Sequence, residues 1–187
     1  MTDPTGAAFW EGAPTRFPSL KGAASTAYYF ECERSLIEAF FPALEGQRIL
    51  KTDLWDEAKN TEILKWTAER GARPFGIDIS LGLAREARET LSGHAPGVVV
   101  ADVRALPFRP GSFDLIYSMG TIEHFPETDQ AARELFAVLR PGGRAIIGVL
   151  SLRARARRGP ARLRARMGGF AASAHCARRP NFSRILR

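Results

Sequence analysis

Short apolar segments alternate with helical segments from residue 48 to residue 150, and this alternation constrains the fold more than any other feature. The apolar segments are continuous rather than alternating in polarity, which is typical of strands buried on both faces of a parallel sheet. We predict strands at residues 48–51, 75–79, 98–101, 112–117 and 145–150, and helices at residues 25–41, 58–70, 81–91 and 128–139. The pattern predicts a doubly wound, mostly parallel α/β sheet with right-handed crossovers.

Charge divides the chain into a mildly acidic body and a basic tail. The formal net charge of the 187 residues is +7, but residues 151–187 contain eleven arginines and no acidic residue. Residues 1–150 therefore hold 16 of the 27 basic residues and all 20 acidic residues, which gives the body a net charge of −4. The positive charge of the whole chain is thus no argument for a nucleic-acid-binding body.

Composition predicts three regions. Residues 1–24 are rich in Gly, Pro, Ala and Thr and are predicted to be a flexible arm. Its aromatic residues are expected to pack on the surface, and closure over a ligand is the alternative. Residues 25–150 are the predicted folded domain. Residues 151–187 have no apolar period, so we predict a disordered Arg-rich tail without strands; a basic helix and a frameshifted product are the alternatives.

The first residues contain an early acid and no apolar core segment, so we expect no secretory signal. No apolar run is long enough to span a bilayer, and we expect a cytoplasmic protein without a membrane partner. Cys32 and Cys176 lie far apart without metal-ligand spacing, so free thiols are expected and a metal site is not.

The loop after the first predicted strand distinguishes two ligands that bind at the strand ends of such sheets. A pyrophosphate requires glycines there, whereas residues 52–57 contain no glycine and carry Asp53, Asp56 and Glu57. Carboxylates within about 4–6 Å would repel a pyrophosphate by several kcal/mol and would attract a sulfonium cation such as that of S-adenosylmethionine. Alternatively, Asp56 and Glu57 are simple partners of a helix dipole.

Two further carboxylates follow predicted strands. Asp78 ends the second strand, 21 residues after Glu57, where nucleotide-binding sheets place an acid that takes both ribose hydroxyls. Capping of the next helix is the alternative role for Asp78. Asp102 follows the third strand and can accept a hydrogen bond from an adenine amino group, with Val103 against the ring. Asp114 begins its strand, on the opposite edge of the sheet, and is interpreted as structural.

The segments FGIDIS, ADVRALPFRPGSFDLIYSMGTIEHF and LRPGGRAIIGV together resemble the class I S-adenosylmethionine-dependent methyltransferases, most closely the type 11 methyltransferase domain. The resemblance covers residues 48–149 and implies a Rossmann-like methyltransferase fold with S-adenosyl-L-methionine as cofactor. It implies that Asp78 binds ribose, that Asp102 and Val103 hold adenine, and that Ser118 and Met119 face the methionine part. The predicted cofactor site comprises Thr52, Asp53, Asp78, Ile79, Asp102, Val103, Ser118 and Met119.

The chain departs from this family in two places. Lys51 stands at the position of the family's acid, and residues 53, 55 and 57 replace its glycines. Trp55 is then expected to obstruct the cofactor, or alternatively Asp53 replaces the acid and binds the cofactor's amino group. The family's sheet also continues with two more strands, which we expect to be missing here, so that residues 145–150 form an exposed apolar edge.

The expected activity is methyl transfer from S-adenosyl-L-methionine to a small-molecule acceptor. His124 and Glu123 follow the fourth predicted strand, and either can be the base that takes a proton from the acceptor. The alternative role of His124 is to shape its loop. Two alternative functions are a truncated or non-catalytic methyltransferase-like protein and a methyltransferase that grips nucleic acid with its Arg-rich tail.

Overall fold

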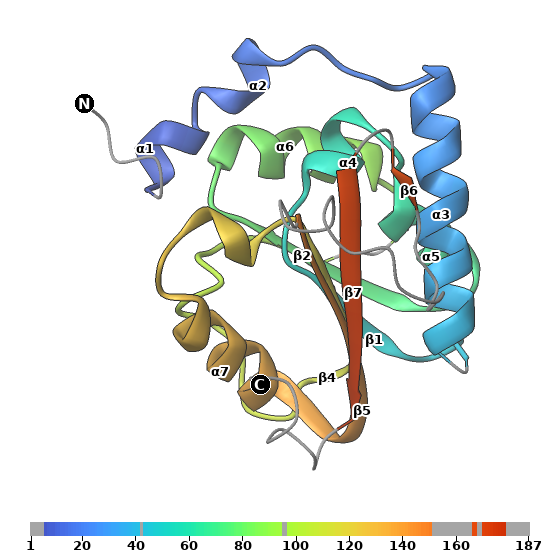
Figure 1. Ribbon diagram of the computed structural model, residues 1–187, viewed down its shortest axis with the longest axis vertical. Coiled ribbons are helices and arrows are strands. Elements are labelled where there is room, and N and C mark those ends of the chain that lie inside the picture. The colour runs from blue at the N-terminus through green and yellow to red at the C-terminus, as the bar shows by residue number, and fades with distance from the viewer. Residues whose placement is uncertain (1–5, 42, 95–96, 151–165, 168–169, 179–187) are drawn as a thin grey trace.

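The computed structural model describes residues 6–41, 43–94, 97–150, 166–167 and 170–178 (Figure 1). At its centre is a sheet with the strand order β3-β2-β1-β4-β5-β7-β6, in which β1 to β5 pair in parallel. This confirms the predicted doubly wound sheet. The strands are β1 (Arg48–Lys51), β2 (Arg73–Asp78), β3 (Gly97–Val100), β4 (Phe113–Met119), β5 (Leu139–Leu150), β6 (Arg166–Met167) and β7 (Phe170–Arg178).

Helices pack on both faces of the parallel part of the sheet (Figure 1). One buried apolar cluster contains side chains of α3, α5 and α6, and the cluster on the other face contains side chains of α7. None of the helices in the described part of the chain is long and apolar enough to cross a membrane. The helices are α1 (Ala7–Trp10), α2 (Ala13–Arg16), α3 (Ala24–Phe40), α4 (Trp55–Lys59), α5 (Ile63–Glu69), α6 (Leu81–Thr90), α7 (Thr128–Val138) and the 3₁₀ helix η1 (Ile122–His124).

Successive residues of the central strands belong to opposite cores. On β1, Ile49 lies in the cluster shared with α3 and α5, and its neighbour Leu50 lies in the cluster shared with α7. On β4, Leu115 and Ile116 divide in the same way. Side chains of a strand point alternately to the two faces of a sheet, so a strand covered on both faces needs continuous apolar sequence.

Strand β5 begins earlier than the sequence predicts. The strand was predicted to begin at residue 145, but residues 141–143 already lie within β5, as an irregularity in its pairing with β4. Phe113 pairs with Leu139 and Leu115 pairs with Arg144, so the β5 side has extra residues in this interval. Gly142 has a φ of 79°, a left-handed conformation that glycine adopts without strain.

The C-terminal segment differs from the prediction. Residues 170–178 form β7, which pairs antiparallel with β5 from Arg144↔Arg178 to Leu150↔Ala172. The expectation that residues 151–187 contribute no strand is therefore wrong for this segment. Its sequence is rich in alanine and lacks the β-branched residues that signal a strand, so the signal was weak. The segment pairs with β5, so the expectation that residues 145–150 form an exposed edge is also wrong. The arginine-rich run at 151–165 lies outside the described residues.

The loop after β1 is held against β2 by close packing between Leu54 and Gly76. Leu54 has no exposed surface, and a Cβ added to Gly76 would lie 2.3 Å from its Cδ2 atom. Leu54 is enclosed by the core, so it cannot move away from a larger residue at position 76. A glycine in β2 therefore makes room for the side chain that anchors this loop.

Replacement of Gly76 by alanine should lower the free energy of unfolding by about 1–3 kcal/mol because it overpacks the contact with Leu54. Urea unfolding followed by circular dichroism measures this loss. The double variant Gly76→Ala with Leu54→Ala should lose less than the sum of the two single losses, because the shorter side chain relieves the overlap. Strictly additive losses would contradict the contact.

Candidate active site

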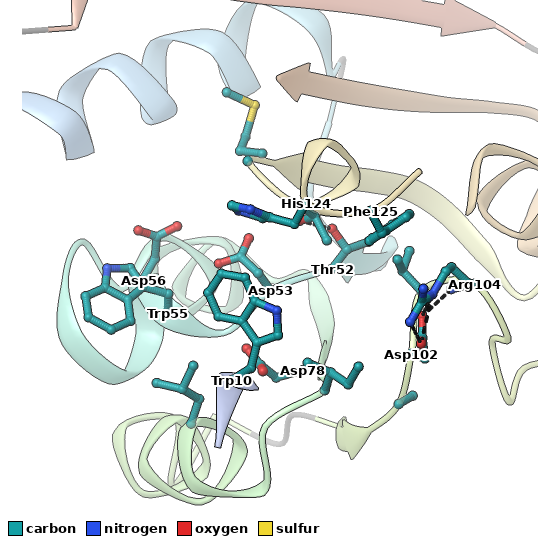
Figure 2. Close-up of a pocket in the computed structure, with 17 residues that line it drawn as sticks. Trp10, Thr52, Asp53, Trp55, Asp56, Asp78, Asp102, Arg104, His124 and Phe125 are labelled. Atoms are coloured by element: carbon teal, nitrogen blue, oxygen red, sulfur yellow. Dashed lines mark hydrogen bonds and ion pairs between the residues drawn. The ribbon is translucent and has the colours of Figure 1, made fainter. Parts of the chain in front are cut away.

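A cavity of about 340 Å³ opens at the carboxyl ends of the parallel strands (Figure 2). Its wall is built by the ends of β2 and β4, the loops after β1, β3 and β4, and residues of α1, α4 and α6. This is the edge at which open α/β sheets bind ligands, and the volume lies in the range of cofactor sites. The lining residues are Trp10, Thr52, Asp53, Trp55, Asp56, Asp78, Ile79, Leu83, Ala101, Asp102, Val103, Arg104, Met119, Gly120, Thr121, His124 and Phe125.

Asp78 is the most enclosed acid at the end of a strand in this wall. It is 6% exposed, and its two carboxylate oxygens accept the backbone N–H groups of Leu54 at 2.9 Å and Ser80 at 2.8 Å. Burial raises the pKa of Asp78, although these two hydrogen bonds oppose the shift. Ser80 caps α6 with its own side chain by accepting from Leu83 N–H. Asp78 is therefore fixed in orientation and joins the loop after β1 to the start of α6.

Asp102 is paired with a residue that the sequence analysis did not single out. Arg104 donates to both carboxylate oxygens of Asp102 at 2.6 to 3.0 Å, and its guanidinium group lies 4.9 Å from the ring centre of Phe125. Burial alone would raise the pKa of Asp102, but the hydrogen bonds and charge of Arg104 outweigh it and lower the pKa. A second ion pair joins Arg104 to Glu127. Asp102 thus faces the cavity as an anion that already holds a cation.

Hydroxyl groups join the loops after β1 and β4. Thr52 donates to the Ser118 hydroxyl at 2.7 Å and shares a hydrogen bond of 2.9 Å with Thr121. Ser118 has no exposed surface, so it supports the wall from behind. Met119 does line the cavity, and its sulfur occupies space beside Gly148 of β5, where an added Cβ would lie 2.4 Å from it. The position of Met119 thus depends on a glycine in the next strand.

Asp53 lines the cavity and has a raised pKa. Burial raises the pKa of Asp53 to about 7; the charge of Lys51 opposes this shift, and the charges of Asp56, Glu57 and Asp78 add to it. Trp55 also lines the cavity, but its indole ring lies edge-on to Phe17 of the arm with ring centres 5.8 Å apart. The cavity therefore remains open beside Trp55 (Figure 2).

The N-terminal arm forms part of the cavity wall. Trp10 packs edge-on to His124 with ring centres 4.8 Å apart, and it projects into the cavity between His124 and Asp78 (Figure 2). The next residue, Glu11, accepts hydrogen bonds from Leu81 and Gly82 N–H at the start of α6, at 2.5 and 3.3 Å. A carboxylate is stabilised there by the free amides and the helix dipole. The arm was expected to place its aromatic residues on the surface, and for Trp10 this is wrong.

The structure gathers most of the predicted site residues around one cavity. Thr52, Asp53, Asp78, Ile79, Asp102, Val103, Met119 and His124 all line it. Ser118 lies behind the wall, and Glu123 belongs to η1 but does not line the cavity. No sequence pattern predicted Arg104 or Phe125 in the wall, and for Trp10 closure over a ligand was the alternative to packing on the surface. The single signal for Arg104 was its spacing of two residues from Asp102.

The chemistry of the wall fits a cationic nucleoside. Four lining residues are acidic, at positions 53, 56, 78 and 102. The lining residue Arg104 carries a fixed positive charge, which Asp102 and Glu127 neutralise. The fixed carboxylate of Asp78 suits ribose hydroxyls, and Val103 and Phe125 supply apolar surface beside Asp102. The loop after β1 lacks glycines and cannot cradle a pyrophosphate.

Comparisons with known proteins agree with this chemistry. The model of a methyltransferase-domain family matches residues 58–147. A solved S-adenosylmethionine-dependent methyltransferase from Mesorhizobium loti superposes with a TM-score of 0.56 and 25% identity, covering 71% of this chain and 56% of that one. Residues 58–147 therefore form a methyltransferase domain of the class I S-adenosylmethionine-dependent type.

Two curated methyltransferases illustrate the similarity. The chloroplastic tocopherol O-methyltransferase of Arabidopsis thaliana is 38% identical over 81 residues, and methyltransferase GfsG of Streptomyces halstedii is 33% identical over 93 residues. These alignments cover 41% and 47% of this chain but only 23% and 34% of the two relatives. The chain thus matches about a quarter to a third of the length of these methyltransferases.

The raised pKa of Asp53 predicts how stability depends on pH. Between the ordinary value of 3.8 and about 7, the native protein holds a proton on Asp53 that the unfolded chain has lost. The free energy of unfolding should therefore fall through this window as pH rises. Asparagine does not titrate, so Asp53→Asn should lose less stability between about pH 5 and about pH 8. Urea unfolding at both pH values tests this, and equal losses in the two proteins would contradict it.

Proposed function

We propose that this chain transfers a methyl group from S-adenosyl-L-methionine to a small-molecule acceptor bound beside Trp10 and His124. The proposal is carried by one observation: the buried carboxylate of Asp78 lies in the same cavity wall as Met119 and His124. An adenosine held at the end of β2 can therefore present its sulfur toward the end of β4. The bound cofactor supplies an electrophilic methyl group on a sulfonium sulfur.

The residues of the wall divide between the parts of the cofactor. Asp78 accepts from the ribose hydroxyls with the oxygen lone pairs that Leu54 and Ser80 leave free. Asp102, Val103 and Ile79 contact the adenine side, and Thr52, Asp53 and Met119 contact the methionine side. Ser118 acts through Thr52, whose hydroxyl it fixes.

The loop after β4 supplies the base that takes a proton from the acceptor. A lone pair on an acceptor O, N or C atom forms a bond to the methyl carbon, the bond from this carbon to sulfur breaks, and S-adenosylhomocysteine leaves. His124 is exposed and lies at the cavity, so its imidazole can take the proton that the acceptor releases. Glu123, the other base predicted from the sequence, precedes it on η1 but does not line the cavity, so His124 is the favoured candidate.

The arm supports a small acceptor rather than a polymer. Trp10 stands against His124, and Glu11 fixes the arm to α6. The space beside the reacting methyl is thereby bounded by an indole ring. The alternative of a nucleic-acid substrate gripped by the Arg-rich tail concerns residues that lie largely outside the described part of the chain.

Isothermal titration with S-adenosylhomocysteine tests the role of Asp78. Replacement of Asp78 by asparagine removes the charged acceptor for the ribose hydroxyls and should weaken binding by about 10- to 100-fold. Asp129→Asn, an exposed acid in the first turn of α7, is the matched control and should bind like the wild-type protein. Unchanged affinity in Asp78→Asn, with its melting temperature retained, would refute the assignment.

A further inference from the structure

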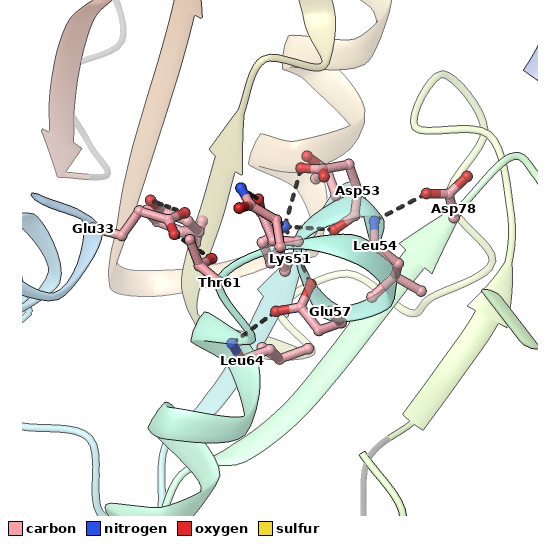
Figure 3. Close-up of polar contacts among 12 residues, drawn as sticks. Glu33, Lys51, Asp53, Leu54, Glu57, Thr61, Leu64 and Asp78 are labelled. Carbon is pink, nitrogen blue, oxygen red and sulfur yellow. Dashed lines mark hydrogen bonds and ion pairs between the residues drawn. The ribbon is translucent and has the colours of Figure 1, made fainter. Parts of the chain in front are cut away.

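Lys51 lies buried beneath the loop after β1 and is surrounded by carboxylates (Figure 3). It is the last residue of β1 and has no exposed surface. Its ammonium group donates to the backbone carbonyl of Asp53 at 2.7 Å. It also forms ion pairs with the side chains of Asp53 at 3.2 Å, Asp56 at 3.0 Å and Glu57 at 3.4 Å.

The surrounding charges keep Lys51 protonated. Burial alone would lower its pKa, but the carboxylates of Asp53, Asp56 and Glu57, with Glu33 beyond them, raise its pKa well above the ordinary value. Glu33 enters from α3 and accepts from Thr61 at 2.6 Å and from Tyr117 at 2.9 Å. Burial and the charge of Asp56 raise the pKa of Glu33, and Lys51 and these two hydrogen bonds oppose the shift.

Two of the acids that Lys51 holds are also part of the cavity wall. Asp53 and Asp56 line the cavity, whereas Glu57 is fully buried and accepts from Leu64 N–H at 2.8 Å. The bond from Lys51 to the Asp53 carbonyl fixes the loop backbone, and Leu54 N–H then reaches Asp78. One buried cation therefore holds the two acids of the wall, whereas Asp78 keeps a hydrogen bond from Ser80 N–H that does not involve Lys51.

We propose that Lys51 is a positioning residue that aims the carboxylate of Asp53 at the amino group of the cofactor's amino-acid part. This rests on the proposed function, because it takes the cavity as the cofactor site. A glycine-free loop cannot approach that part of the ligand with its backbone, so a charged side chain recognises it instead. Lys51 does not touch the ligand and acts through Asp53.

A purely structural role for Lys51 makes a different prediction. If Lys51 only neutralised Glu57 and Glu33, its loss would destabilise the fold and weaken all ligands of the cavity alike. The positioning role predicts a loss confined to ligands that carry the amino group. S-adenosylhomocysteine has the complete amino-acid part, and methylthioadenosine has the same adenosine and sulfur without it. Comparison of the two ligands therefore separates the roles.

Isothermal titration of both ligands should be carried out with the full chain, the variant Lys51→Met and the control Lys65→Met. Lys65 is partly exposed and pairs with Glu62, away from the cavity wall. Lys51→Met should bind S-adenosylhomocysteine about tenfold or more weakly, the worth of one charge-assisted hydrogen bond, and methylthioadenosine with unchanged affinity. Asp53→Asn should show the same selective loss. The double variant Lys51→Met with Asp53→Asn should lose no more affinity for S-adenosylhomocysteine than either single variant.

Two variants, one of them Asp53→Asn, keep the test decisive if Lys51→Met does not fold. The variant Lys51→Met with Glu57→Gln removes the buried cation together with one fully buried acid, and the same selective loss is expected. Asp53→Asn retains Lys51 and replaces an acid whose pKa is already about 7, so it is expected to fold. Equal weakening of both ligands in these variants, or no weakening, overturns the proposal. Failure of the wild-type chain to bind either ligand would instead overturn the proposed function itself.

Discussion

A buried ammonium group under the end of β1 is the interaction on which the cavity depends. Removing an ion from water costs several kcal/mol even after relaxation, so Lys51 is tolerated only because oxygen atoms surround it. Four carboxylates surround this one cation, at positions 33, 53, 56 and 57. Burial, together with repulsion between neighbouring carboxylates, raises the pKa of Asp53 to about 7 and that of Glu33 well above its ordinary value. The loop is therefore ordered by charge where a glycine loop would be ordered by backbone geometry.

Three separate contacts hold the N-terminal arm against the elements around the cavity. Glu11 satisfies amides at the start of α6, the helix that follows Asp78. Phe17 packs on Trp55 of α4, and Trp10 packs on His124 of η1. Residues before position 24 thus contact three separate elements around the opening. The arm thereby adds a wall beside His124 that the sheet alone does not provide.

The sequence predicts the sheet well because its signals are local. Each central strand needs a continuous apolar run, and acids that follow such runs, as Asp78 and Asp102 do, must lie at one edge of a parallel sheet. The position of Trp10 could not be predicted, because its partner His124 lies more than a hundred residues away and a Gly- and Pro-rich arm has no periodicity. The alanine-rich strand β7 lacked a signal for the same reason, since its order comes from β5.

The environment of Lys51 could not be predicted from the sequence either. The segment RILK predicts a strand, and the acids after it are compatible with simple helix capping. Only the fold shows that three of these carboxylates turn back onto the lysine rather than out to solvent. The departure from the family's first motif was visible in the sequence, but its consequence depends on side-chain directions that a linear pattern does not contain.

The most direct test of this account is nitrogen-detected NMR of the Lys51 side chain as pH is raised from neutral. The account predicts an ammonium signal that is protected from solvent exchange and persists above the ordinary lysine pKa of 10.5, with carbon shifts of the Asp53 carboxyl group changing near pH 7. A Lys51 signal typical of a neutral amine at neutral pH, or of a freely exchanging surface lysine, would contradict it.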